Sequence, residues 1–273
     1  SHDDTIRLWD INTGDLLKTL NHQSFVTTIA YSPDGKTLVS GSWDGTVRFW
    51  DSSDWQLLKT ITGHTSRLYS IAYSPDGNIL TCGAGDKLEL WDFQTDKRLK
   101  TITGSRTYFY AVAYSPDGET IASGRTLTSV RQTGRFKGSF AAGRSNVISL
   151  AYSPDGGILA TGSDNREGNI RLWEVRTGEQ LLTGDLLKTL TGHTKSVNAL
   201  MFSPDGSTLA SGSSDNTIML WDPNTGEHLK TLIGHSDYVN DIVFSLDGTR
   251  LVSGGRDDTI RVWDVETGEL RFP

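Results

Sequence analysis

Short stretches of alternating apolar and polar residues follow one another along the whole chain and are separated by turn residues. The stretch from Phe25 to Ile61 shows the pattern once. Its β-branched and aromatic residues favour strands, and Pro33-Asp34-Gly35 and Asp44-Gly45 supply turns between them. The strands that this stretch predicts are residues 26–31, 37–40, 46–50 and 57–61, which we name a to d in chain order. Four antiparallel strands form a small sheet that cannot bury both of its faces alone.

The same pattern recurs about every 41 residues, which is the period expected of four-stranded propeller blades. Trp-Asp pairs close the predicted c strands at Trp9, Trp50, Trp91, Trp221 and Trp263, and Trp173-Glu174 is a variant. The turn Ser-Pro-Asp-Gly begins at Ser32, Ser74, Ser115, Ser153 and Ser203, and Ser245-Leu246-Asp247-Gly248 is a variant. Gly-His pairs place histidines at His64, His193 and His235, and Asn21-His22 is a variant. Several motifs that return in one fixed order indicate a repeat architecture.

These signatures resemble the WD-repeat β-propeller family over nearly the whole chain. The resemblance implies an all-β fold, a β-propeller of four-stranded antiparallel blades whose faces are buried by stacking around an axis. It also implies a function: a scaffold or adaptor that binds other proteins or peptides on the loop face of the propeller, without catalysis. A propeller enzyme would need a unique polar cluster near the central channel, and the sequence shows none.

The repeats predict six complete units plus an extra N-terminal c–d hairpin, hence a six-bladed or an incomplete seven-bladed propeller. The a strands begin near Phe25, Arg67, Tyr108, Asn146, Ser196 and Tyr238. Residues 15–20 could complete the last blade, which would leave residues 4–10 to compete with the nearly identical residues 258–264. Alternatively, the chain is a piece of a larger protein, or an open ring that exchanges strands with a neighbouring chain. We expect one WD-repeat domain over residues 1–273, a fragment of a longer protein, as a monomer or a strand-exchanged oligomer.

A recurring set of His, Ser, Asp and Trp residues superficially suggests a hydrolase triad. A catalytic set is needed once, whereas this set occurs several times. The family resemblance implies instead a buried hydrogen-bond network that stiffens each blade. The expected sets are His22, Ser40, Asp44 and Trp50; His64, Cys82, Asp86 and Trp91; His193, Ser211, Asp215 and Trp221; and His235, Ser253, Asp257 and Trp263.

The resemblance places the docking face at the loops that lead into strand a and between strands b and c. Aromatic and arginine residues, which dominate interface hot spots, gather at those positions. The candidate partner-binding residues are Phe25, Trp43, Arg67, Tyr108, Tyr238 and Arg256. Trp43 is the strongest candidate, because the core tryptophans of the repeats are already accounted for. The alternative is that Trp43 lies flat over the neighbouring blade.

Two units are irregular. The unit from Tyr108 to Phe140 lacks the Trp-Asp pair, and a basic strip from Arg125 to Arg144 contains no acidic residue. This strip is either a docking patch for a polyanion or a phosphopeptide, or a decayed repeat with solvated arginines.

In the unit from Asn146, residues 177–187 contain a slipped duplication, which is either a binding feature or tolerated drift in a surface loop.

The composition of the chain disfavours several classes of function. The chain has 273 residues and a formal net charge of -7, which disfavours binding to nucleic acid or to anionic membranes. No apolar run is long enough for a membrane helix, and no secretory signal is visible. The single Cys82 excludes an internal disulfide and suits a cytoplasmic location. The histidines fall mostly one per repeat, so we expect no metal site and no cofactor.

Overall fold

The computed structural model describes residues 3–11, 13–64, 66–104, 108–124, 127–130, 136–140, 146–164, 168–175 and 185–272. All regular secondary structure in these residues is β-strand. The chain divides into two compact units, residues 1–123 with 132–134, and residues 124–131 with 135–273. Among the described residues there is no helix with the length and apolarity that a membrane crossing requires.

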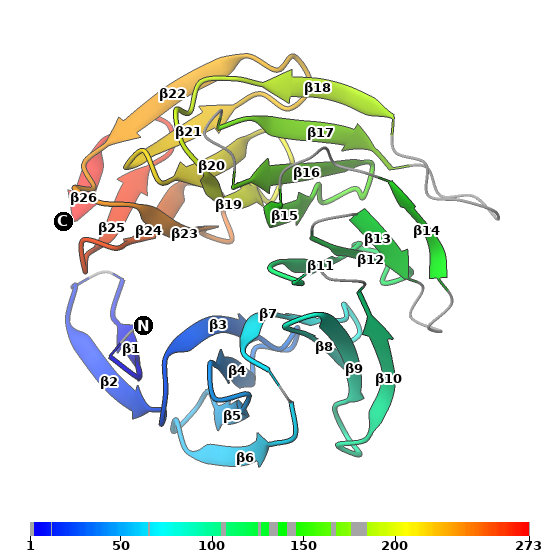
Figure 1. The fold of residues 1–273 in the computed structure, drawn as a ribbon. Helices are drawn as coiled ribbons and strands as arrows, with labels where there is room; N and C mark the ends of the chain where they lie inside the picture. Colours follow the sequence, from blue (N-terminus) through cyan, green and yellow to red (C-terminus); the bar gives the residue numbers. More distant parts are fainter. Residues whose placement is uncertain are drawn as a thin grey trace. The chain divides into compact units, whose positions relative to one another are not determined.

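The first unit begins with a two-stranded sheet, and two four-stranded antiparallel sheets and a hairpin follow it (Figure 1). The strands of the first sheet are β1 (Thr5–Trp9) and β2 (Leu16–Asn21). The next sheet contains β3 (Val26–Tyr31), β4 (Thr37–Ser42), β5 (Val47–Asp51) and β6 (Leu57–Ile61). The third contains β7 (Leu68–Tyr73), β8 (Ile79–Ala84), β9 (Lys87–Asp92) and β10 (Arg98–Thr103). The hairpin consists of β11 (Val112–Tyr114) and β12 (Ile121–Ser123).

The second unit begins with a hairpin and continues with three four-stranded antiparallel sheets. The hairpin consists of β13 (Leu127–Val130) and β14 (Phe136–Phe140). The first sheet contains β15 (Val147–Tyr152), β16 (Ile158–Ser163), β17 (Ile170–Glu174) and β18 (Leu186–Leu190). The second contains β19 (Val197–Phe202), β20 (Leu209–Ser213), β21 (Thr217–Trp221) and β22 (His228–Ile233). The third contains β23 (Val239–Phe244), β24 (Arg250–Gly255), β25 (Ile260–Asp264) and β26 (Leu270–Phe272).

The predicted fold class is confirmed in the described residues. Each of six repeat units contributes four strands in chain order, and the extra hairpin β1–β2 precedes them. One closure hypothesis is wrong. Residues 15–20 do not complete the last blade, because β2 pairs with β1, and β26 takes the place of the fourth strand beside β25. Both pairings join neighbours in the chain, whose short loops cost little entropy to close.

Neighbouring blades within a unit pack face to face, which buries the apolar side of each strand. In the first unit, Val39 and Phe49 share a core with Ile71 and Tyr73 of the following blade. The close approach requires small residues: a Cβ atom on Gly41 would lie only 2.6 Å from Cδ1 of Ile71. Because Gly41 has no side chain, it leaves the space that Ile71 of the next blade occupies. This packing holds the loops between strands in fixed places.

Candidate functional site

Two complete networks of four side chains lie in the second unit. Oγ of Ser211 lies 2.8 Å from Nε2 of His193 and accepts a hydrogen bond of 2.8 Å from Nε1 of Trp221. Nδ1 of His193 is 2.9 Å from the Asp215 carboxylate. Burial alone raises the pKa of Asp215, but hydrogen bonds from His193 and Thr217 outweigh burial and hold this pKa well below its usual range. The network thus joins strands β20 and β21 to the loop before β19 and to the turn between β20 and β21.

The last blade repeats this geometry. His235 and Trp263 both reach Oγ of Ser253 at 2.8 Å, and Nδ1 of His235 is 2.9 Å from Asp257. The backbone N–H of Ser236 also donates to the Asp257 carboxylate. The serine hydroxyls of both networks are buried, so a substrate in solvent does not reach them. These hydrogen bonds connect the strands and loops of one blade in a single buried network.

In the blade β3–β6 the fourth member of the expected network is missing. Ser40 is 2.7 Å from Nε2 of His22 and accepts from Trp50 at 2.9 Å. Nδ1 of His22, however, is buried without a partner in the described part of the chain. Asp44 accepts from the N–H and the hydroxyl of Thr46 instead. The placement of Asp44 in this network is therefore corrected.

A change in the loop before the histidine explains why Asp44 is not reached. In the complete networks, Gly192 and Gly234 lie so close to the tryptophan rings that a Cβ atom would come within 2.9 and 2.8 Å of them. Asn21 stands at the equivalent position before His22. A Cβ atom at this position would meet the tryptophan ring in the geometry of the complete networks. In the described residues Nδ1 of His22 has no partner.

The blade β7–β10 replaces the expected aspartate by a glutamate that the sequence interpretation missed. Nδ1 of His64 lies 2.6 Å from Glu89, whose other oxygen is 3.2 Å from the Arg98 guanidinium. Glu89 is buried, whereas Asp86 is exposed. The assignment of Asp86 is therefore wrong. Asp86 stands only five residues before Trp91, whereas Asp215 stands six residues before its tryptophan. This shorter turn was the signal that could have revealed the change.

Three other b-strand residues occupy the position that Ser211 and Ser253 hold in the complete networks. Thr161 takes the serine place in the blade β15–β18 and accepts from Nε1 of Trp173 at 3.0 Å. Ser123 takes it on β12, where its buried hydroxyl has no partner in the described residues. The buried thiol of Cys82 takes it on β8, and Trp91 there interacts with Glu89 instead of a b-strand hydroxyl. The hydrogen-bond networks therefore range from complete ones around Ser211 and Ser253 to none at Ser123 within the described residues.

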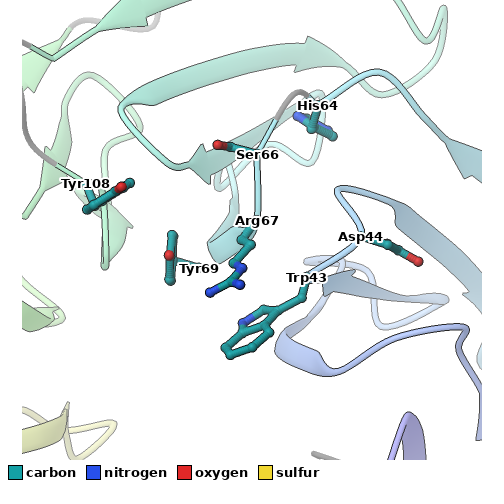
Figure 2. Close-up of a pocket in the computed structure, with 7 residues that line it drawn as sticks. All are labelled: Trp43, Asp44, His64, Ser66, Arg67, Tyr69 and Tyr108. Atoms are coloured by element: carbon teal, nitrogen blue, oxygen red, sulfur yellow. The ribbon is translucent and has the colours of Figure 1, made fainter.

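A separate cluster lies on the loop face of the first unit. The ring of Trp43 contacts that of Phe25 with centroids 5.0 Å apart, and the guanidinium of Arg67 lies 4.1 Å over the indole. Trp43 is half-buried, so it lies partly under the neighbouring blade and partly open. Figure 2 shows Arg67 between Trp43 and Tyr69. These three residues and Tyr108 are among those that line a pocket of about 410 Å³. We call Trp43, Arg67, Tyr69 and Tyr108 the docking cluster.

The sequence predicted only some of the aromatic residues that meet in this cluster. Tyr108, an expected binding residue, packs against Tyr69 and Tyr110, which the sequence interpretation did not select. Tyr69 and Tyr110 contact each other edge to face with centroids 5.1 Å apart. Tyr69 lies on β7 and Tyr110 lies just before β11, and the alternation of strand residues does not predict which side chain of a neighbouring blade each one contacts. Phe25, Trp43, Arg67 and Tyr108 thus lie on one surface of the first unit.

The remaining candidates, Tyr238 and Arg256, form a second cluster in the other unit. The Arg256 guanidinium lies 5.5 Å from the Tyr238 ring and Lys195 lies 5.6 Å from it. An exposed ion pair of 3.9 Å joins Arg256 to Asp237. The arginines of the basic strip Arg125–Arg144 and most of the insertion at residues 177–187 lie outside the described residues.

Comparison with known families agrees with this architecture. Residues 184–222 and 226–264 each match the WD domain, G-beta repeat. The chain is therefore a WD-repeat β-propeller protein. Residues 1–183 match the family described as the IFT122 first beta-propeller, and the chain belongs to this family. No curated protein sequence matches the chain significantly. Propeller domains built from WD repeats generally mediate protein–protein interactions.

The incomplete network around His22 predicts a pH dependence of stability. Burial and the charge of Arg48 lower the pKa of His22 to about 4. Between the unfolded value of about 6.5 and this value, the unfolded chain binds a proton that the folded chain does not bind. Stability is therefore expected to fall, by at most about 3 kcal/mol, as the pH falls through this window. Urea unfolding from pH 7.5 to 4, with hydrogen exchange on β3–β6, measures the loss.

The variant His22→Gln provides the comparison. It should flatten the pH profile of β3–β6 in that window, because glutamine does not titrate. His228→Gln is the matched control, since His228 is exposed on β22 in the other unit. A profile of His22→Gln as steep as that of the wild type would show that His22 titrates normally.

Proposed function

We propose that this chain is a non-catalytic scaffold or adaptor module that binds partner proteins through the docking cluster of its first unit. The observation that carries this proposal is the stack of Arg67 on Trp43 at the wall of a cavity of about 410 Å³. Tryptophan, tyrosine and arginine contribute most to binding energy at interfaces. Here all three types meet in one concave surface.

The arrangement of Arg67 suits recognition of a polypeptide. The Arg67 guanidinium lies 4.1 Å over the Trp43 indole, and its N–H groups can donate to a carboxylate or a carbonyl of a partner. Within the described part of the chain no carboxylate forms an ion pair with Arg67. Tyr69 and Tyr108 add hydroxyl groups and aromatic faces beside it. A partner that fills the cavity covers a partly open indole, an arginine and two phenols at once.

Further parts of this proposal rest on the repeat architecture. The repeats support one propeller domain over residues 1–273 whose partners are proteins or peptides rather than nucleic acid or membrane. The buried thiol of Cys82 suits a reducing compartment such as the cytoplasm. The arginines of the basic strip Arg125–Arg144 lie outside the described residues, and the proposal therefore rests on the docking cluster alone.

Trp43→Ala is expected to reduce the capture of partner proteins from native lysate at least tenfold, about the loss seen for hot-spot tryptophans. The thermal midpoint should change little, because the half-buried ring contacts Phe25 and Arg67 rather than the central core. Affinity capture with quantitative mass spectrometry measures the first effect, and calorimetry measures the second.

Leu58→Ala is the matched control, because Leu58 is an exposed apolar residue on the outer strand β6 of the same blade. It should capture the same partners as the wild type. Arg67→Lys keeps the charge but removes the planar fork and should weaken capture as well. If Trp43→Ala lowers the midpoint strongly while capture persists, Trp43 is a core residue and another surface binds.

A further inference from the structure

The docking cluster contains an arginine whose guanidinium has only an aromatic contact in the described part of the chain. The guanidinium of Arg67 lies 4.1 Å over the Trp43 ring, and within the described residues it takes part in no hydrogen bond or ion pair. Arg98 of the same unit, by contrast, pairs with Glu89 at 3.2 Å. The side chain of Arg67 is exposed. Its N–H groups are therefore available to a ligand.

The charges around Arg67 favour a carboxylate over a phosphate. Among the described residues that line the pocket, Arg67 and Asp44 carry formal charges of opposite sign. Asp44 is exposed, whereas Asp215 of a complete network is bonded to its histidine. One guanidinium balances one carboxylate, but it leaves much of the charge of a phosphate dianion uncompensated beside Asp44. Phosphopeptide sites use clusters of arginines instead.

A row of aromatic rings continues from Arg67. In Figure 2, Tyr69 and Tyr108 lie on the other side of Arg67 from Trp43. The Tyr69 ring contacts those of Tyr108 and Tyr110, with centroids 5.8 and 5.1 Å apart. Tyr108 is 51% exposed, and Tyr69 is half-buried. Exposed aromatic rings of this kind are typical of surfaces that bind proline-rich segments in the polyproline II conformation.

A polyproline II segment suits this surface for physical reasons. Its backbone makes no internal hydrogen bonds, so its carbonyls can accept from the hydroxyl groups of Tyr69 and Tyr108. Its backbone is already extended before it binds, so little conformational entropy is lost. The pocket of about 410 Å³ lies within the range of roughly 300–1,000 Å³ that is usual for ligand sites, which suits a short segment.

We propose that the docking cluster binds a proline-rich segment of a partner protein that carries an acidic side chain. The carboxylate of this side chain pairs with Arg67, and the prolines beside it pack on Tyr69 and Tyr108. The ring of Trp43 helps to hold the guanidinium in place, so less freedom is lost when the ion pair forms. This inference rests on the proposed function and names the chemical class of the partner.

Pools of short synthetic peptides, acetylated and amidated at their ends, test this assignment. The central residue is glutamate, glutamine, lysine or phosphoserine, and the flanking positions are equal mixtures of proline, alanine and leucine. Each pool is passed over the immobilised chain, and the retained peptides are quantified by mass spectrometry. We expect the glutamate pool to be retained about tenfold or more above the glutamine pool and above the phosphoserine pool. Proline should be enriched beside the glutamate, and retention should fall as the salt concentration rises.

Reversal of the charge at Arg67 gives a result that a loss of folding cannot imitate. Arg67→Glu should retain the lysine pool in preference to the glutamate pool. Arg67→Gln should retain the glutamate and glutamine pools equally. Arg7→Gln is the matched control, because Arg7 is exposed on β1 of the same unit and does not line the pocket. This control should select peptides as the wild type does.

Three results would each overturn the proposal: retention of the phosphoserine pool above the glutamate pool, equal retention of the glutamate and glutamine pools by the wild type, or no enrichment of proline. The variant Trp43→Ala then separates this inference from the proposed function. If it still abolishes the capture of partner proteins, the docking cluster binds a partner of another chemical class. Capture that is insensitive to Trp43→Ala would contradict the proposed function itself.

Discussion

Replacement of Glu89 by leucine is expected to lower the free energy of unfolding of the blade β7–β10 by about 3–5 kcal/mol at pH 7. The Glu89 carboxylate is buried between His64 at 2.6 Å and Arg98 at 3.2 Å. Removal of one partner leaves a buried imidazole and an arginine without their acceptor, which costs more than the gain from leucine burial. The loss is expected near the lower end, because Arg98 is half-exposed and regains water. Urea unfolding combined with hydrogen exchange on β7–β10 measures it.

The effect of Glu89→Leu should depend on pH in a defined direction. Burial alone raises the pKa of Glu89, but His64 and Arg98 outweigh burial and hold this pKa below its ordinary value. Such a carboxyl stabilises the fold above its unfolded pKa of about 4.3, and this contribution is lost as the pH falls through the folded value. The difference between the wild type and Glu89→Leu should therefore shrink below about pH 4.

Glu227→Leu is the matched control, because Glu227 is exposed in the turn between β21 and β22. Its effect on stability should stay within about 0.5 kcal/mol. If both leucine variants unfold at the same urea concentration as the wild type, the ion pair of Glu89 does not stabilise the blade.

Ser211→Ala is expected to destabilise the blade β19–β22 by about 2–4 kcal/mol, since two buried groups each lose a hydrogen-bond partner. Trp221 donates to the Ser211 hydroxyl and His193 lies 2.8 Å from it. Neither ring reaches water when the hydroxyl is removed, because both are buried. Equilibrium unfolding followed by tryptophan fluorescence, with exchange on β19–β22, measures the loss.

Ser123→Ala makes the same chemical change at the equivalent position of another b strand. The Ser123 hydroxyl is buried without a partner in the described residues, so its removal should be neutral or slightly stabilising. Equal losses for the two variants would indicate that the serine matters for packing alone. A large loss for Ser211→Ala only would show that the network itself carries the stability.

Much of the fold follows from local sequence, because strand periodicity and turn chemistry act over a few residues. The stretch from Val26 to Ile61 alternates as strands do, and the structure has its four strands there. The turn at Ser32 is equally local: its hydroxyl donates to Asp34 at 2.6 Å and accepts from the N–H of Thr37. The repeat of these signals made the number of strands per unit predictable.

The candidate networks were predictable only where every spacing was regular. For Ser211 and Asp215 the regular spacing of the motif placed both residues in one network, and both contact His193 in the structure. Asp44 and Asp86 stand at similar motif positions but do not contact the histidines, because an asparagine precedes His22 and a turn is shortened before Glu89. Small local changes therefore redirected side chains that the motif alone assigns.

The sequence by itself determined the strands, the turns and the repeat, because each depends on residues that are neighbours in the chain. Only the tertiary structure decided which charges meet and which aromatic rings stay open. Glu89 on β9 contacts His64 in the loop before β7, and Arg67 lies over Trp43 of the preceding blade. Such contacts depend on how two sheets stack, to within about an ångström, and side-chain packing at that scale is not encoded in any one repeat.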